Sequence, residues 1–250
     1  MTNLSVNLNK VAMLRNARPL AIPSVVKMGE ISIAAGAHGL TVHPRPDQRH
    51  IRRTDVYELA KMLKSHPAIE YNIEGNPFES PFMEIIREVR PDQCTLVPDD
   101  PNQSTSDHGW NVAQDADRLR PIVEALNELG CRVSLFMDPD IEQIKRVCDL
   151  GGDRQASPGV DRIELYTEPY ATAYRQGKGE ESFEIYRQAA ECAQAVGLGV
   201  NGGHDLNLEN LPKFKEIPNL LEVSIGHALI ADALEMGFAG AVEAYLKVLK

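Results

Sequence analysis

The segment from residue 161 to residue 203 decides the fold. It begins with DRIELYT (161–167), a short β-rich run, and later enters EESFEIYRQAAECAQAVG (180–197), where apolar residues recur at helical spacing. LGVNGG (198–203) then repeats the strand pattern. The helical stretch ends at Gly197, a common helix stop. A strand, a helix and a second strand in this order form one β/α repeat.

The same repeat continues outward to both ends of the chain. Short runs bounded by Gly, Pro, Asp or Asn predict eight strands, at 4–9, 40–44, 68–74, 93–98, 132–138, 161–167, 198–203 and 221–226. Helical patterns lie at 55–66, 82–89, 118–130, 140–152, 180–197 and 239–250. This alternation predicts an α/β fold, a (β/α)8 TIM barrel that forms a single domain over residues 1–250.

A doubly wound open sheet is the alternative fold. Such sheets usually have fewer strands, and no G-x-G-x-x-G motif follows the first predicted strand. The barrel is therefore the favoured prediction.

Composition and charge limit the classes of partner. The chain has 250 residues, of which 43% are hydrophobic and 25% charged, so it resembles an ordinary globular protein. Its formal net charge of −10 argues against nucleic acid as the main partner. An anionic small substrate is still allowed, because a local cluster of Arg and Lys sets the field within a cleft.

Neither the cysteines nor the termini indicate export. The 4 cysteines include no C-x-x-C pair, which fits reduced thiols better than a disulfide framework or a zinc site. No apolar signal region begins the chain, and no run of about 18 apolar residues predicts a membrane span. We expect a cytoplasmic protein that does not contact membranes.

Polar residues gather at the ends of the predicted strands, where barrel enzymes place their chemistry. The first strand ends in Asn7, Asn9 and Lys10, and the second in His43 and Arg45. The remaining polar positions are Glu70 and Glu74 in the third strand, Glu164 in the sixth, Asn201, Gly202, Gly203 and His204 at the seventh, and Ser224, Gly226 and His227 at the eighth.

Each of these features also has a purely structural interpretation. His43 alone could be a hydrogen-bonded structural histidine. Glu70 and Glu164 would be costly if buried unpaired, so each is either ion-paired or functional. The glycines could be turn residues, although the loops after strands seven and eight commonly bind phosphate. The basic run could be a solvated helix entry or an anion clamp; it comprises Arg45, Arg49, His50, Arg52 and Arg53.

Two long loops are predicted on the catalytic side of the barrel. DDPNQSTSDHGWN (99–111) follows the fourth strand, and we expect it to act as a lid. EPYATAYRQGKGEE (168–181) follows the sixth strand and is predicted to be a second such loop. No H-x-H or H-E-x-x-H spacing occurs, so no catalytic metal is expected.

Several motifs together resemble the pyridoxine 5′-phosphate synthase family. They are VNLNKVAMLRNAR (6–18), TVHPRPDQRHI (41–51), TLVPD (95–99), RVSLFMD (132–138), VNGGHDL (200–206) and IGHALI (225–230). They follow the family's order and cover nearly the full length. The resemblance implies condensation of 1-deoxy-D-xylulose 5-phosphate with 3-amino-2-oxopropyl phosphate, in a homo-octamer that uses no metal or organic cofactor.

The resemblance also implies roles for individual residues. His43 and Glu70 match the family's general bases, and His204 matches its proton donor. Arg45, His50 and Thr105 match positions that hold the pentulose phosphate, and Asn9 and Lys10 lie beside them. Positions around the aminoketone phosphate match Asn7, Arg18, Asp205, Gly226 and His227.

The chain departs from some family members near these positions. Asn9-Lys10 replaces Asp-His, Tyr166 replaces a histidine, and Glu168 replaces a glycine. Asp205 stands where glycine is common. The alternatives are another phosphate-binding barrel enzyme, such as an aldolase, isomerase or thiamine-phosphate-synthase-like transferase, and a non-catalytic barrel. An aldolase should carry a Schiff-base lysine inside a strand, whereas a non-catalytic barrel should have lost the acid–base residues.

Overall fold

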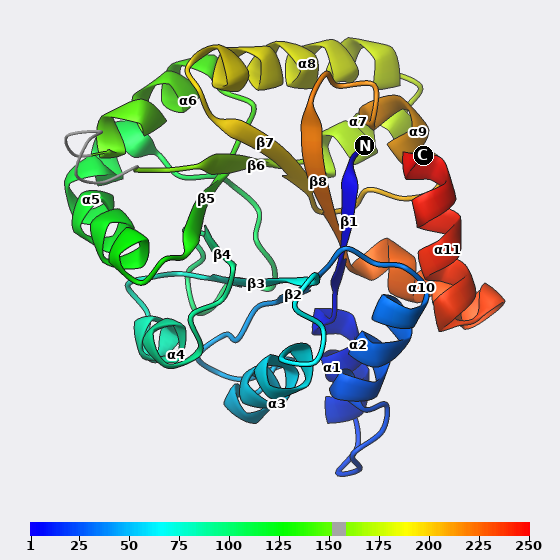
Figure 1. Cartoon of the computed structure of the whole chain (residues 1–250). Helices are drawn as coiled ribbons and strands as arrows, with labels where there is room; N and C mark the ends of the chain where they lie inside the picture. The colour runs from blue at the N-terminus through cyan, green and yellow to red at the C-terminus, as the bar shows by residue number, and fades with distance from the viewer. Residues whose placement is uncertain (152–158) are drawn as a thin grey trace.

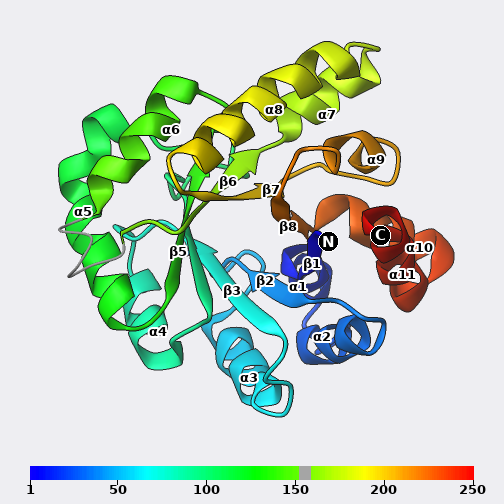
Figure 2. The same cartoon turned by 45° about the horizontal axis from the view of Figure 1, so that its top comes forward.

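The computed structural model of the chain describes residues 1–151 and 159–250. Eight parallel strands form a closed barrel, and helices surround it (Figures 1 and 2). β1 (Asn3–Asn7) pairs with both β2 (Gly39–Val42) and β8 (Leu220–Ile225), which closes the sheet. The predicted (β/α)8 barrel is confirmed. The other strands are β3 (Glu70–Gly75), β4 (Gln93–Leu96), β5 (Arg132–Met137), β6 (Arg162–Tyr166) and β7 (Gly199–Gly203).

The predicted strands are confirmed in number and order, but their ends differ by a few residues. The first strand stops at Asn7, so Asn9 and Lys10 begin a helix instead. The helices are α1 (Asn9–Asn16), α2 (Val25–Ala34), α3 (Arg53–Leu63), α4 (Phe82–Val89), α5 (Val112–Glu128), α6 (Ile141–Val147), α7 (Glu168–Arg175), α8 (Gly179–Ala195), α9 (Leu211–Phe214), α10 (His227–Met236) and α11 (Phe238–Leu249).

The sequence patterns missed several helices, mainly those around the mouth. The prediction that 168–181 is a loop is wrong, because α7 and the start of α8 occupy it. Pro169 lies in the first turn of α7, where its missing N–H would have had no helical partner. The predicted helix at 140–152 is shorter, since α6 passes into a 3₁₀ turn (Cys148–Leu150). Residue 152 lies outside the described residues.

The apolar core lies between the barrel and its helices, while the barrel interior is polar. In β3, the Tyr71 hydroxyl donates to the Val56 carbonyl of α3, so odd positions face the helices. The even positions face inward. Asn72 there joins a hydrogen-bonded belt, donating to Thr41 (3.3 Å) and accepting from Thr95 (3.0 Å). Inward-facing residues near the strand ends therefore lie in polar surroundings.

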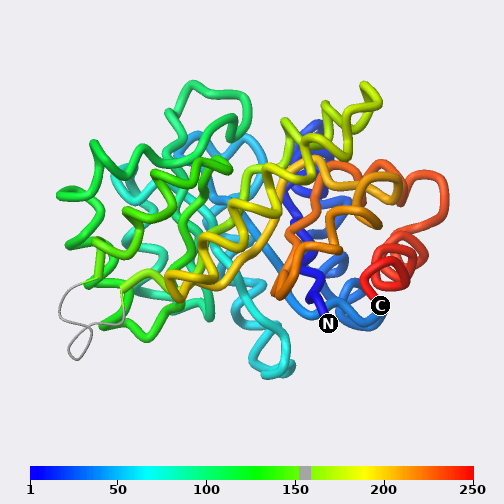
Figure 3. Tube along the Cα trace, turned by 90° about the horizontal axis from the view of Figure 1, so that it is seen from above, coloured from blue at the N-terminus to red at the C-terminus, as the bar shows by residue number. Residues whose placement is uncertain are grey.

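The two ends of the barrel differ in what covers them. In Figure 3 the chain N-terminus lies at the bottom, and the loop after β4 rises at the top. The top is thus the carboxyl end of the strands, which we call the mouth, and the opposite end is called the base. Within the described residues, no helix combines the length and apolar character needed to span a bilayer.

Candidate active site

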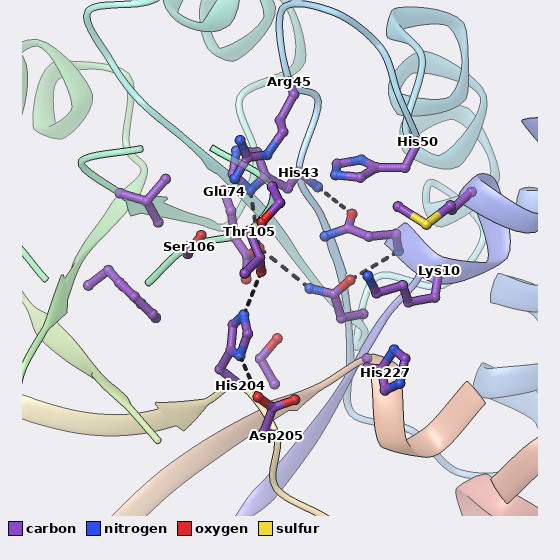
Figure 4. Close-up of a pocket in the computed structure, with 18 of the residues that line it drawn as sticks. Lys10, His43, Arg45, His50, Glu74, Thr105, Ser106, His204, Asp205 and His227 are labelled. Atoms are coloured by element: carbon purple, nitrogen blue, oxygen red, sulfur yellow. Dashed lines mark hydrogen bonds and ion pairs between the residues drawn. The ribbon is translucent and has the colours of Figure 1, made fainter. Parts of the chain in front are cut away.

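A pocket of about 310 Å³ opens at the mouth of the barrel (Figure 4). This volume suits a small-molecule ligand. The structure brings most of the predicted site residues to its wall. Those that line it are Asn7, Asn9, Lys10, His43, Arg45, His50, Thr105, His204, Asp205, Gly226 and His227.

Glu70 does not lie with them; the glutamate of the third strand that lines the pocket is Glu74. Glu70 is the first residue of β3, at the base, where Arg132 donates to it at 2.6 Å. Glu74 points inward on the same strand face, about 13 Å further along, and lines the pocket. The two glutamates share one face because side chains alternate with a period of two, so the pattern alone did not distinguish them.

His43 and Glu74 form the buried acid–base side of the pocket. His43 Nδ1 lies 3.9 Å from Glu74 Oε2, and the Asn7 amide donates to the same oxygen at 3.4 Å. Burial raises the pKa of Glu74 to about 7. Burial, reinforced by the charge of Arg45, holds the pKa of His43 well below its ordinary value. His43 is therefore a neutral imidazole, and Glu74 can gain or lose a proton near neutral pH.

Glu164 is a further pocket carboxyl, which no motif assigned. It is buried on β6, and burial followed by the charge of Glu74 raises its pKa well above the ordinary range. A neutral carboxylic acid can donate a hydrogen bond into the pocket. Gly203 makes room for it, since a Cβ at that position would come within 2.0 Å of Glu164 Oε1. This close approach explains Gly203 without any contact to phosphate.

Arg45 lies deep in the pocket wall and contacts the loop after β4 (99–111). It pairs with Asp99, and its other terminal nitrogen donates to the Gln103 carbonyl at 2.9 Å. Arg49 reaches the same carbonyl at 2.6 Å. The predicted loop after β4 is confirmed as a loop, and these two arginines fix its path across the mouth.

The residues of the basic run make different contacts. Arg45 and His50 line the pocket, whereas Arg53 pairs with Glu88 on α4 at 3.2 Å. The Ile51 amide donates to His50 Nδ1 at 2.9 Å, so the proton of the neutral ring resides on Nε2. Burial lowers the pKa of His50 to about 4. His50 is thus a neutral hydrogen-bond donor, supported by Arg15, which donates to the His50 carbonyl at 3.2 Å.

Asn9 makes a contact within the protein that shows why Asn is compatible with a position where some family members have Asp. Its Oδ1 accepts from the backbone N–H of His43 at 2.8 Å, and its own backbone N–H donates to Asn7 Oδ1 at 3.0 Å. An aspartate could accept the same bond. Asn9 therefore fixes the backbone that carries His43.

The far side of the pocket is formed by β7, β8 and the start of α10. Gly226 is the N-cap of α10, and no side chain caps this helix. Its first N–H groups are available to an anion, a common property of helix N-termini. Figure 4 shows His204, Asp205 and His227 on this side, opposite Arg45, His43 and His50.

His204 is contacted at both ring nitrogens. Thr105 Oγ1 of the loop after β4 lies 2.9 Å from Nε2, and Asp205 Oδ2 lies 3.2 Å from Nδ1. The Tyr166 ring meets the imidazole edge to face, with centroids 5.4 Å apart. Tyr166 therefore packs against the histidine.

Arg18 is not part of this pocket. It lies in the exposed segment between α1 and α2 and is not among the lining residues. The family resemblance implied a position for it around the aminoketone phosphate, but α1 separates it from the end of β1. No three His, Cys, Asp or Glu side chains group as a metal site would require, within the described parts of the chain.

The fold and the pocket define a class of protein: a single-domain TIM-barrel enzyme with histidine and glutamate groups in a pocket at the carboxyl ends of its strands. Residues 4–250 match the family model described as pyridoxal phosphate biosynthesis protein PdxJ. The chain belongs to this family, which confirms the resemblance seen in the sequence.

Relatives from three bacteria support the same assignment. The chain is 50% identical to "Pyridoxine 5′-phosphate synthase" of Xanthomonas campestris, covering 99% of this chain and 96% of that protein. The protein of the same name from Albidiferax ferrireducens is 48% identical, with 99% and 97% coverage. That of Brucella anthropi is 50% identical, with 98% of each covered. The predictions of an enzyme and of a role in vitamin B6 biosynthesis are thereby supported.

Solved structures of low sequence identity share the fold. Phosphoribosylanthranilate isomerase from Thermotoga maritima is 13% identical with a TM-score of 0.56, covering 100% of this chain and 98% of that one. KGPDC from Streptococcus mutans is 11% identical with a TM-score of 0.62, covering 100% and 97%. At these identities the likeness concerns the barrel alone.

Proposed function

We propose that the chain condenses 1-deoxy-D-xylulose 5-phosphate with 3-amino-2-oxopropyl phosphate to form pyridoxine 5′-phosphate, inorganic phosphate and water. The observation that carries the proposal is one pocket lined by His43, Glu74 and His204, with cationic or anion-binding groups on opposite sides. Membership of the PdxJ family supports it.

The pentulose phosphate binds on the side of Arg45 and His50. Arg45 supplies the charge, and His50 supplies an Nε2–H donor, as its Nδ1 contact to Ile51 requires. Lys10 and Asn9 complete this subsite, and Thr105 closes it from the lid. Because Asp99 pairs with Arg45, the phosphate has to share or replace that partner.

The aminoketone phosphate binds at the N-terminus of α10. Gly226 and the following amides donate to it, and His227 and Asn7 lie beside them. Arg18 lies outside the pocket, so it can reach this phosphate only if it comes from a second copy of the chain.

The acid–base steps fall to His43, Glu74 and His204. An amine attacks a ketone to give an imine, and enolisation, two eliminations, ring closure and a final deprotonation follow. These steps are additions, eliminations and proton transfers, all of which acid–base groups can assist, so the proposal includes no cofactor. A phosphate dianion beside Arg45 offsets the charges that lower the pKa of His43, which makes His43 a stronger base once substrate is bound.

Glu164 donates a hydrogen bond to oxygen in the developing transition states. Its raised pKa keeps it protonated at neutral pH. Such a donor stabilises negative charge where it forms, provided that water is excluded. The lid loop supplies that exclusion when it lies over the mouth.

We also propose a cytoplasmic homo-octamer. Exposed apolar residues on α1, on the segment after it and on α10 support contacts between copies; they are Met13, Leu14, Leu20, Ile22, Leu234 and Met236. Light scattering at several protein concentrations tests the assembly. A monomer at working concentration contradicts it.

The function is tested by incubating purified protein, after chelation of metals, with both substrates and with each alone. Pyridoxine 5′-phosphate and inorganic phosphate are measured in the same samples. We expect both products only when the two substrates are combined. If folded protein forms neither product, the proposed reaction is wrong, and Asn9, Lys10, Tyr166 and Glu168 become candidates for a changed substrate.

A further inference from the structure

The turn after β7 contains two adjacent residues in the left-handed region of backbone conformation. φ is +85° at His204 and +56° at Asp205. Residues with a side chain rarely adopt such angles, although Asp and Asn tolerate them better than most. Two in succession need support from their surroundings.

Two buried side chains provide that support. The Thr167 hydroxyl donates to the Gly203 carbonyl at 2.7 Å and also contacts the His204 carbonyl. The Asn210 amide donates to the Asp205 carbonyl at 3.2 Å. Thr167 and Asn210 are 0% and 1% exposed, so this turn is fixed by the interior of the protein.

The fixed turn brings neighbouring side chains together. In an extended strand, residues 204 and 205 would point to opposite faces. Here Asp205 Oδ2 lies 3.2 Å from His204 Nδ1, and the other ring nitrogen lies 2.9 Å from Thr105 Oγ1 across the pocket. Figure 4 shows this chain of contacts running from Asp205 through His204 to Thr105.

We propose that Asp205 is a positioning residue that fixes the tautomer and direction of His204. A carboxylate only accepts hydrogen bonds, so His204 must carry a proton on Nδ1. Nε2 then becomes the nitrogen that exchanges a proton with a bound molecule. The inference rests on the proposed function in one respect, namely that His204 acts as its proton donor.

The alternative role for Asp205, contact with a substrate phosphate, fits the geometry less well. A carboxylate repels a phosphate dianion, and one of its oxygens already faces the histidine. The hydrogen bond from His204 holds the pKa of Asp205 below its ordinary value, so the charge is retained. The group therefore orients a neighbour rather than binding an anion.

The tautomer is read directly by long-range ¹H–¹⁵N spectra of the full chain labelled at histidine. A His204→Gln variant assigns the signal among the 7 histidines. We expect Nδ1–H and an unprotonated Nε2 in the neutral ring of the wild-type protein. Asp205→Asn, whose amide can donate to Nδ1, should shift the ring toward the Nε2–H tautomer. An Nε2–H ring in the wild type, or an identical ring in both proteins, overturns the inference.

Kinetics provide the second readout. We expect Asp205→Asn and Asp205→Gly to lower kcat by about 10- to 100-fold with little change in the KM for the aminoketone phosphate. Glycine suits the positive φ, so Asp205→Gly should fold at least as stably as the wild type. Asp117→Asn, an exposed change on α5, is the control and should leave kcat unchanged.

The outcomes separate the two proposals. A raised KM with unchanged kcat in both Asp205 variants assigns Asp205 to the phosphate and overturns the positioning role. A wild-type protein that makes no product overturns the proposed function. The tautomer measurement needs no substrate, and it still decides whether Asp205 controls His204.

Discussion

The mouth and the base of the barrel both hold buried glutamates, but in different settings. At the base, Glu70 meets Arg132 at 2.6 Å and Glu222 meets Arg162 at 3.5 Å. At the mouth, Glu74 contacts the Asn7 amide at 3.4 Å and lies 3.9 Å from His43. Arginine partners therefore mark the structural end, and a histidine beside a pocket marks the reactive end.

Ionisation alone does not separate the two ends. Burial raises the pKa of Glu222 to about 8 in spite of Arg162, and it raises that of Glu74 to about 7. Both carboxyls can thus hold a proton near neutrality. Glu74 lines the pocket and Glu222 does not, so access to a bound molecule is what distinguishes them. A perturbed pKa indicates function only together with that access.

The largest expected effect on product formation comes from a substitution at the mouth. Glu74→Gln removes a group able to exchange protons while preserving its size, so formation of pyridoxine 5′-phosphate should fall by about 10²- to 10⁴-fold. The measurement is kcat with both substrates saturating, at equal concentrations of folded protein. If the variant turns over at a rate close to wild type, Glu74 does not take part in proton transfer.

Arg45→Ala tests the cationic side of the mouth. Loss of a charge-assisted contact should raise the KM for the pentulose phosphate by roughly 10- to 100-fold, with a smaller change in kcat. Arg53→Ala, on the exposed part of the same basic run, is the matched control. Equal effects of the two changes would contradict a specific clamp at Arg45.

The pH dependence of stability should reveal the carboxyl at the mouth. The pKa of Glu74 is about 7 in the folded chain, against an ordinary 4.5, so the folded state binds more protons between these values. The free energy of unfolding therefore falls as pH rises from about 4.5 to 7, by roughly 3 kcal/mol from this group. Urea unfolding at pH 5 and pH 8 measures this difference. Between these two pH values the free energy of unfolding should fall less for Glu74→Gln than for the wild type. An equal fall in the free energy of unfolding for both proteins would show that the pKa of Glu74 is not raised.

The smallest catalytic effect is expected at the base. Glu70→Gln weakens the pair with Arg132 and should cost roughly 1–3 kcal/mol of unfolding free energy, since the pair is only partly buried. Product formation per folded molecule should stay within about twofold of wild type, because the residue lies far from the pocket. A loss of kcat comparable with that of Glu74→Gln would erase the distinction between the two ends.

The sequence determined the barrel and the composition of its mouth. Strand and helix periods are local properties, so eight β/α repeats were readable without any contact information. Barrel enzymes place their chemistry at the ends of the strands, so the polar residues there were predicted to form the site. His43, Arg45 and His204 do line the pocket. α1 and α7 were missed because the first follows a strand directly and the second has Pro169 in its first turn.

Tertiary structure alone decided which polar residues meet. Glu70 and Glu74 share a strand face and a residue type, but Glu70 begins β3 at the base, whereas Glu74 lies near its carboxyl end and lines the pocket. Arg18 ends the family motif at 6–18 but lies outside the pocket, because a helix intervenes. The His204–Asp205 contact depends on two positive φ angles held by Thr167 and Asn210. Periodic patterns record burial and direction along one element, whereas the position of a residue in the barrel and the hydrogen bonds that fix this turn depend on the three-dimensional fold.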